Sequence, residues 1–291
     1  MQKRSIMIQI TGVTKKLDKF SIKDISLEIP DGYITGVIGL NGAGKTTLFH
    51  LMLGLYVPDQ GEIVIDGMKY ADQERAIREK TGVVLQERLF EEYETLEGNA
   101  AMYGRYYGNY QDGKMHGLMQ QFGLNPKQKY KTLSKGEELK FQFAFALAHN
   151  PKLLLLDEPT GNFNPEFREI FWQQLRDFIA DGEHSVILAT HLTDDLDRMA
   201  DYIIYMEKGE ILLDSDIERI RTEYRMIQGE NYKVKLFPSD YVIAMEEGAY
   251  GAKALVRHKK RFDYANLVTS APTIEELMYF MTKRKNQKAR R

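Results

Sequence analysis

A glycine-rich segment at residues 39–46, G-L-N-G-A-G-K-T, has the spacing of a loop that binds phosphate groups. An apolar run at 33–38 predicts a strand before it, and apolar residues at helical spacing follow it. Glycines let backbone N–H groups surround phosphate oxygens, and the N-terminus of the following helix adds a favourable dipole. These flanking elements disfavour the alternative, a glycine-rich turn with an incidental lysine. The segment predicts a nucleoside triphosphate site made by Gly39, Leu40, Asn41, Gly42, Ala43, Gly44, Lys45, Thr46 and Thr47.

Three side chains outside the glycines add chemistry to this site. Lys45 is expected to reach the β- and γ-phosphates, and the Thr46 hydroxyl to bind Mg²⁺. Asp157 ends an apolar strand and is expected to hold Mg²⁺ through water next to Thr46. Glu158 follows it and is expected to polarise the attacking water as a general base. An isolated Asp-Glu pair would more often only solvate a strand end, but the phosphate loop in the same chain favours the catalytic interpretation.

The surrounding sequence supplies elements that can hold these residues. Apolar stretches at 152–159 and 184–190 flank a helical pattern at 167–182, and this order predicts a parallel sheet. Residues 87–150 are helix-like and punctuated by glycines, which indicates an inserted subdomain. Further strands are predicted at 6–13, 22–29, 61–67, 81–86 and 201–214. From about Met226, short strands (Y-K-V-K-L-F, Y-V-I-A-M, K-A-L-V-R-H) and a helix from about Thr273 are expected to pack against the main domain.

Composition removes several other classes of protein. The 291 residues are 43% hydrophobic and 28% charged, as in soluble globular proteins, and they contain no cysteine for disulfides, metal thiolates or nucleophiles. No apolar stretch approaches the roughly 20 residues of a membrane span. The N-terminal M-Q-K-R-S-I-M-I-Q-I lacks the apolar core of a secretory signal, so export of the chain is not expected. The formal net charge of −2 gives no reason to expect a nucleic-acid partner.

Over about residues 6–225, the order of these motifs resembles the ATP-binding subunits of ABC transporters. That family has a signature near L-S-G-G-Q shortly upstream of the acidic strand, and L-S-K-G-E stands there at 133–137. By resemblance, Ser134 and Gly136 open a helix onto the γ-phosphate of a nucleotide held by another subunit, where a helix N-terminus suits an anion. Lys135 and Glu137 depart from the commonest signature.

The resemblance also implies roles for four single residues. Gln86, at the end of 81–86, matches the loop residue that senses the metal or the attacking water, although a glutamine after a strand is by itself usually a surface residue. His191 matches the switch histidine that contacts the γ-phosphate; a partly buried structural histidine is the alternative. Asn164 replaces the aspartate of the family's Asp-Pro loop, and Phe20 is the nearest aromatic residue to the place of the adenine-stacking side chain. The implied catalytic residues are Glu158, His191 and Gln86; the implied Mg²⁺ ligands are Thr46, Gln86 and Asp157.

The fold class implied is α/β, a P-loop ATPase of the ABC type. It has a parallel core sheet, an N-terminal antiparallel β-subdomain, an inserted helical subdomain and a small C-terminal α+β extension. We expect residues 1–225 to form the nucleotide-binding domain, with its helical subdomain at about 87–150, and residues 226–291 to form the extension.

One phosphate loop and one signature per chain imply that a complete site needs two chains, each lending its signature to the other's ATP. The resemblance therefore implies an ATPase with ATP and Mg²⁺, a second ATP-binding subunit that is a copy or a paralogue, and a transmembrane permease at the cytoplasmic face of the membrane. The expected docking surface is a groove near Gln86 and the helical subdomain, where tyrosines (Tyr93, Tyr103, Tyr106, Tyr107, Tyr110) stand beside glutamates (Glu87, Glu91, Glu92, Glu94, Glu97).

The chain most resembles the ATPases of bacterial exporters of antimicrobial or toxic peptides and drugs, of the bacitracin and phenol-soluble-modulin types. The alternative is a stand-alone regulatory ABC-type ATPase that is not coupled to transport. A translation factor of this family would need two cassettes, and a chromosome-maintenance ATPase would need a long coiled coil between Gln86 and the signature. The gap of residues 87–132 leaves no room for that coiled coil.

Overall fold

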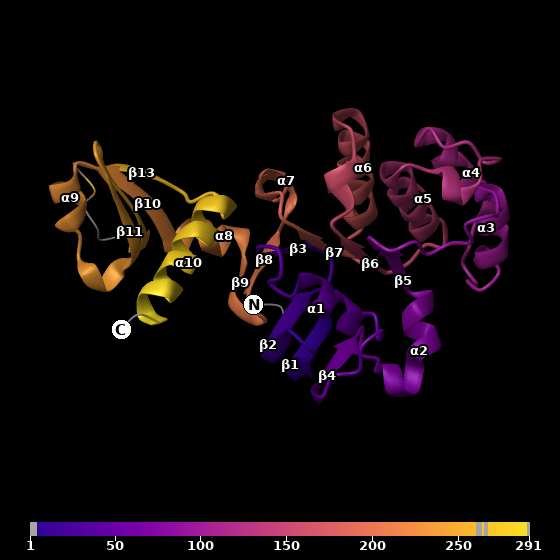
Figure 1. Cartoon of the computed structure of the whole chain (residues 1–291), viewed down its shortest axis with the longest axis horizontal. Coiled ribbons are helices and arrows are strands. Elements are labelled where there is room, and N and C mark those ends of the chain that lie inside the picture. Colours follow the sequence, from indigo (N-terminus) through magenta and orange to yellow (C-terminus); the bar gives the residue numbers. More distant parts are fainter. Residues whose placement is uncertain (1–4, 260–263, 265–266, 290–291) are drawn as a thin grey trace.

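The computed structural model describes residues 5–259, 264 and 267–289. A six-stranded sheet forms the centre of the main domain (Figure 1). Five strands run parallel and the last runs antiparallel, in the order β5 (Thr81–Val84), β6 (Leu153–Asp157), β7 (Ser185–Thr190), β3 (Ile34–Ile38), β8 (Tyr202–Glu207) and β9 (Glu210–Asp216). Every residue of β3, β6 and β7 is buried, as expected for parallel strands covered on both faces.

A smaller antiparallel sheet covers the helix that follows the phosphate loop. Its order is β2 (Ser21–Pro30), β1 (Ile6–Lys16), β4 (Gln60–Ile65). Helix α1 (Lys45–Met52) shares one apolar core with these strands and with the main sheet, because Leu48, Phe49 and Met52 are fully buried in it. The phosphate loop is therefore held between two sheets.

The helical subdomain is attached beside β5 and β6. It contains α3 (Leu96–Gly104), α4 (Asp112–Gln121), the short 3₁₀ turn Tyr130–Thr132 and the long α5 (Lys135–Ala148). Ser134 and Glu137 cap α5 reciprocally, which explains why the helix starts there. Phe90 packs edge-on against Phe141 and Phe145 of this helix. The remaining helical segments of the main domain are α2 (Tyr70–Glu79), the 3₁₀ turn Pro159–Asn162, α6 (Pro165–Ile179) and α7 (Thr193–Met199).

The C-terminal extension lies at the end of the molecule opposite the helical subdomain (Figure 1). Its antiparallel sheet has the order β11 (Val242–Gly248), β12 (Gly251–Arg257), β10 (Tyr224–Gly229), β13 (Val268–Ser270). Helix α10 (Ile274–Ala289) lies between this sheet and the main domain, where Ile274, Leu277 and Phe280 join the large core. Helix α8 (Ile217–Glu223) connects β9 to β10, and the extension also contains α9 (Asn231–Lys235) and the 3₁₀ turn Ser239–Tyr241.

The predicted fold class is confirmed, with its parallel core sheet, antiparallel β-subdomain, helical subdomain and α+β extension. One local prediction is wrong: the segment Y-K-V-K-L-F forms the short helix α9 instead of a strand. Val234 and Phe237 are buried while Tyr232 and Leu236 are exposed, so the buried side chains are three residues apart, as on a helix. Within the described ranges, no helix is long and apolar enough to cross a membrane.

His149, at the end of α5, is a buried titratable group in the main domain. It is 2% exposed, and its ring stacks on Tyr107 at a centroid distance of 4.2 Å. Its Nδ1 lies 3.1 Å from the carbonyl oxygen of Phe145. Burial, which disfavours the charged ring, lowers the pKa of His149 to about 4.

Acid should therefore destabilise the fold through His149. The unfolded chain, in which a histidine has a pKa of about 6.5, binds a proton between about pH 6.5 and 4 that the folded chain does not bind. The contribution of His149 to the free energy of unfolding should fall by up to about 3 kcal/mol across this window. Urea unfolding of wild type and His149→Phe at pH 7 and pH 4.5 measures it. The variant should lose less stability than wild type, and an equal loss in both would contradict the assignment.

Candidate functional site

The phosphate loop joins the end of β3 to α1, whose N-cap is Gly44 with a φ of 111°. A Cβ on Gly39 would lie 2.5 Å from the carbonyl oxygen of Met206, so this position has no space for a side chain. No side chain caps α1, which leaves its first N–H groups directed at the loop for an anion to accept. The loop therefore has the geometry that the glycine spacing predicts.

Lys45 is a buried cation at the centre of the loop. It is 6% exposed, and its Nζ donates a hydrogen bond of 2.8 Å to the carbonyl oxygen of Gly39. Its other partner is Glu158, whose Oε1 lies 3.4 Å from Nζ. Since a buried ammonium needs an anionic partner, a phosphate entering the loop would compete with Glu158 for Lys45.

Thr46 and Asp157 form the part of the site that suits a divalent cation. Thr46 Oγ1 donates a hydrogen bond of 2.9 Å to Asp157 Oδ2. Asp157 is 1% exposed, its Oδ1 has no hydrogen-bond partner, and burial raises the pKa of its carboxyl. No group of three or more histidine or acidic side chains that could enclose a metal occurs in the part of the chain that the structure describes. The residues present therefore fit Mg²⁺ that takes most of its ligands from phosphate and water.

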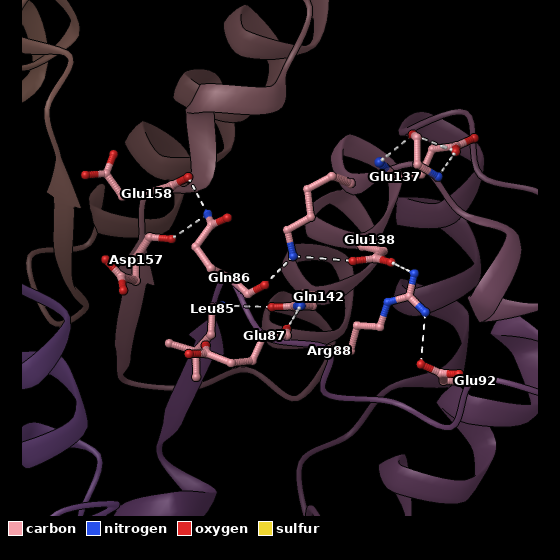
Figure 2. Close-up of polar contacts among 12 residues, drawn as sticks. Leu85, Gln86, Glu87, Arg88, Glu92, Glu137, Glu138, Gln142, Asp157 and Glu158 are labelled. Atoms are coloured by element: carbon pink, nitrogen blue, oxygen red, sulfur yellow. Dashed lines mark hydrogen bonds and ion pairs between the residues drawn. The ribbon is translucent and has the colours of Figure 1, made fainter. Parts of the chain in front are cut away.

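Glu158 lies between Lys45 and His191. Its backbone is left-handed, with a φ of 49°, and its Oε2 is 2.7 Å from Nδ1 of His191. Gln86 points to the same strand end: its Nε2 donates to the carbonyl oxygens of Asp157 at 3.2 Å and Glu158 at 2.9 Å (Figure 2). The structure thus brings the three residues with implied catalytic roles to the carboxyl ends of β5, β6 and β7. The Gln86 amide binds backbone carbonyls here and not the Thr46 and Asp157 side chains that suit the metal.

The signature residues form a separate group. Ser134 is the N-cap of α5, its Oγ donates to Glu137 Oε2 at 2.7 Å, and its N–H donates to the same oxygen at 2.8 Å. A Cβ on Gly136 would lie 2.7 Å from the carbonyl oxygen of Asn162, which explains the glycine. The hydrogen bonds of Ser134 stay within this cap, and in the part of the chain that the structure describes none of them reaches the phosphate loop. Asn164 caps α6 by accepting a hydrogen bond of 3.1 Å from the N–H of Phe167.

Phe20 lies against the phosphate loop, because a Cβ on Gly44 would come within 2.6 Å of its ring. The ring borders a cavity of about 450 Å³ that Gly42 also lines. The other lining residues include four lysines that sequence reasoning missed: Lys16, Lys19, Lys23 and Lys208. Lys208 comes from the β8–β9 turn, about 160 residues after the loop, so no local motif could identify it. The basic cavity beside an aromatic ring suits a nucleotide.

Comparison with known proteins gives the family. The model of the family described as ABC transporter matches residues 22–161. The chain is 33% identical over 218 residues to Nod factor export ATP-binding protein I of Sinorhizobium fredii, covering 73% of this chain and 63% of that protein. It is 32% identical over 215 residues to the protein of the same name from Bradyrhizobium diazoefficiens, covering 72% of this chain and 70% of that protein.

A solved structure of a dimeric ATP-binding cassette, in a post-hydrolysis state bound to ADP and Pi, is similar with a TM-score of 0.65. It is 25% identical, and the match covers 72% of this chain and 99% of that chain. The chain therefore belongs to the ATP-binding proteins of ABC transporters and is an ABC ATPase.

Replacing Lys45 should weaken nucleotide binding itself. In Lys45→Ala the positive charge for the β- and γ-phosphates is lost, and the Kd for a fluorescent ATP analogue should rise by about 100-fold, or about 2.7 kcal/mol. Lys129→Ala, an exposed lysine on the helical subdomain, is the matched control and should bind like wild type. If the Lys45→Ala protein melts like wild type and its Kd is unchanged, Lys45 does not bind the nucleotide.

Proposed function

We propose that this chain hydrolyses ATP to power an ABC exporter, as one of two ATP-binding subunits attached to a transmembrane permease. The observation that carries the proposal is the position of the Glu158 carboxylate between Lys45 and His191, next to the Thr46–Asp157 pair. Residues 1–225 would form the catalytic domain and 226–291 the accessory extension, at the cytoplasmic face of the membrane.

Binding of ATP would exchange the partners of Lys45. The ammonium would leave Glu158 for the β- and γ-phosphates, while the N–H groups at the start of α1 would donate hydrogen bonds to the phosphate oxygens. Thr46 and Asp157 would hold Mg²⁺, which supplies neutralisation of the phosphate charge. Glu158 Oε1 is then available to a water molecule, and the other oxygen stays 2.7 Å from His191, which keeps the carboxylate in place.

Hydrolysis then proceeds at the γ-phosphorus. Glu158 accepts a proton from the water while the water oxygen bonds to the γ-phosphorus. The bond from that phosphorus to the β–γ bridging oxygen breaks. The products are ADP and inorganic phosphate. Because Ser134 and Gly136 lie apart from Lys45 in one chain, a second subunit would supply the signature, and loss of the γ-phosphate would let the two subunits separate.

The direction of transport and the identity of the transported molecule have less direct support. Both relatives named above are export proteins, which favours export, and their cargo is a Nod factor. They give no support to the peptide or drug cargo that the sequence resemblance suggests, which stays a prediction. The stand-alone regulatory ATPase is the second candidate, and recovery of a transmembrane protein with this chain on purification in detergent discriminates the two.

A groove suited to the permease lies between α2 and the helical subdomain. Its volume is about 1140 Å³, and of the five tyrosines named from the sequence, Tyr103, Tyr106 and Tyr107 line it whereas Tyr93 and Tyr110 do not. The predicted glutamates (Glu87, Glu91, Glu92, Glu94, Glu97) are not among its lining residues, whose charges are instead three arginines and three acids: Arg75, Arg78, Arg105, Asp72, Glu74 and Glu79. We propose that a cytoplasmic segment of the permease with both charge signs and an apolar anchor binds there.

Tyr106, which is 70% exposed, tests the groove. Tyr106→Ala should reduce recovery of the membrane partner in detergent by roughly 10-fold, because exposed aromatic side chains in such grooves carry much of the binding energy. Tyr250→Ala, an exposed tyrosine of the extension, should have no effect. Loss of the partner in Glu91→Lys with Glu92→Lys, but not in Tyr106→Ala, would place docking on the acidic segment instead.

Glu158→Gln should bind ATP with wild-type affinity but hydrolyse it at least about 100-fold more slowly, because the amide cannot accept the proton of the attacking water. With Mg-ATP the variant should accumulate as a dimer, which size-exclusion chromatography detects, whereas wild type returns to monomer as ATP is consumed. Turnover near the wild-type rate would reject Glu158 as the base.

A further inference from the structure

Lys135 occupies a position where its charge is locally unfavourable. It is the first residue of α5, and a cation at a helix N-terminus opposes the helix dipole. Glu137 and Glu138 in the same turn have the favourable sign. A residue that breaks a local rule needs a compensating contact, and Lys135 has two.

One contact of Lys135 crosses to Gln86, and the other is with Glu138 on α5 itself. Its Nζ donates a short hydrogen bond to the backbone carbonyl oxygen of Gln86 and lies 3.3 Å from Glu138 Oε2. The other oxygen of Glu138, a residue only 3% exposed, is 2.8 Å from the guanidinium of Arg88. Lys135 and Arg88 therefore share one buried carboxylate and fix Gln86 and its neighbours to α5.

Gln142 extends this attachment one turn further along the helix. Its Oε1 accepts a hydrogen bond of 2.8 Å from the N–H of Leu85, and its Nε2 donates one of 2.9 Å to the carbonyl oxygen of Glu87 (Figure 2). Lys135, Glu138 and Gln142 have the spacing i, i+3, i+7, which places them on one face of α5. That face holds residues 85–88 over their whole length.

The chain of contacts continues to the catalytic strand, because the Gln86 side chain donates to the backbone of Asp157 and Glu158. On the other side, Lys135 directly follows Ser134, the N-cap that would meet the nucleotide of the second subunit. The geometry points to Lys135 as a positioning residue that couples occupancy of the chain's own phosphate site, through Gln86, to the signature that it presents to the other subunit. This inference rests on the proposed function, since it needs two ATP sites in a dimer.

We call the contacts of Lys135 with Gln86 and Glu138 the tether. Removing the tether should leave ATP binding intact but abolish cooperation between the two ATP sites. In Lys135→Met, the affinity of the monomer for ATP should stay within about twofold of wild type, while kcat falls roughly 10-fold and the Hill coefficient for ATP drops to about 1. Lys135→Arg, which keeps a donor and a charge, should restore most of the rate. Lys127→Met, an exposed lysine of the same subdomain, should behave like wild type.

A double variant distinguishes the tether from simple neutralisation of Glu138. In Lys135→Met with Glu138→Gln the buried charge is gone, so a defect due only to a buried carboxylate left with Arg88 as its single cationic partner should disappear. If the tether couples the two sites, cooperation for ATP should stay lost in the double variant. Recovery of cooperation in the double variant would overturn the proposal. A lowered ATP affinity of the Lys135→Met monomer would also overturn it.

Hydrogen exchange gives a readout that does not depend on turnover. At a protein concentration where the full chain is monomeric, Mg-ATP should change exchange in peptides covering residues 84–90 and 133–140. In Lys135→Met the first change should remain and the second should vanish. Absence of any change in wild type would count against the proposed function, whereas equal changes in wild type and Lys135→Met would overturn the tether alone.

Discussion

The site depends on one constraint, the need of the buried Lys45 ammonium for an anion. The carbonyl oxygen of Gly39 supplies only a partial charge, and Glu158 supplies a full one at 3.4 Å. A phosphate group can take the place of that carboxylate without leaving Lys45 unpaired, so the loop does not have to be rebuilt for a nucleotide. In the proposed mechanism, the same exchange releases the Glu158 carboxylate for the hydrolysis step, so ATP binding prepares the site for catalysis.

The parallel sheet makes this exchange possible. Strands β3, β7 and β6 are neighbours, so the phosphate loop, His191 and the acidic pair come from adjacent carboxyl ends although they are far apart in the sequence. The helical subdomain adds Gln86 from the other side of β6, held by the polar face of α5. Helices and strands of the sheet therefore place the site residues.

The sequence predicted features that local rules determine. The phosphate loop and the strand before Asp157 each follow from a few neighbouring residues, and the parallel order follows from the strand–helix–strand pattern. The helix that begins after Ser134 was implied by the family resemblance. Lys208 in the nucleotide cavity and the partners of Lys135 could not be predicted, because contacts between distant segments create them. The helix α9 was missed because Y-K-V-K-L-F alternates like a strand, and only tertiary burial of Val234 and Phe237 selects the helical spacing.

The β8–β9 turn gives the C-terminal helix a part in the support of the phosphate loop. The N–H of Gly209 in this turn donates to the carbonyl oxygen of Ala43 at 2.9 Å, and Lys285 of α10 is 2.9 Å from Glu210, the first residue of β9. Two contacts, joined by the peptide bond between Gly209 and Glu210, therefore link the last helix to the backbone of the phosphate loop. The C-terminal extension thus supports the phosphate loop through residues that lie outside the motif.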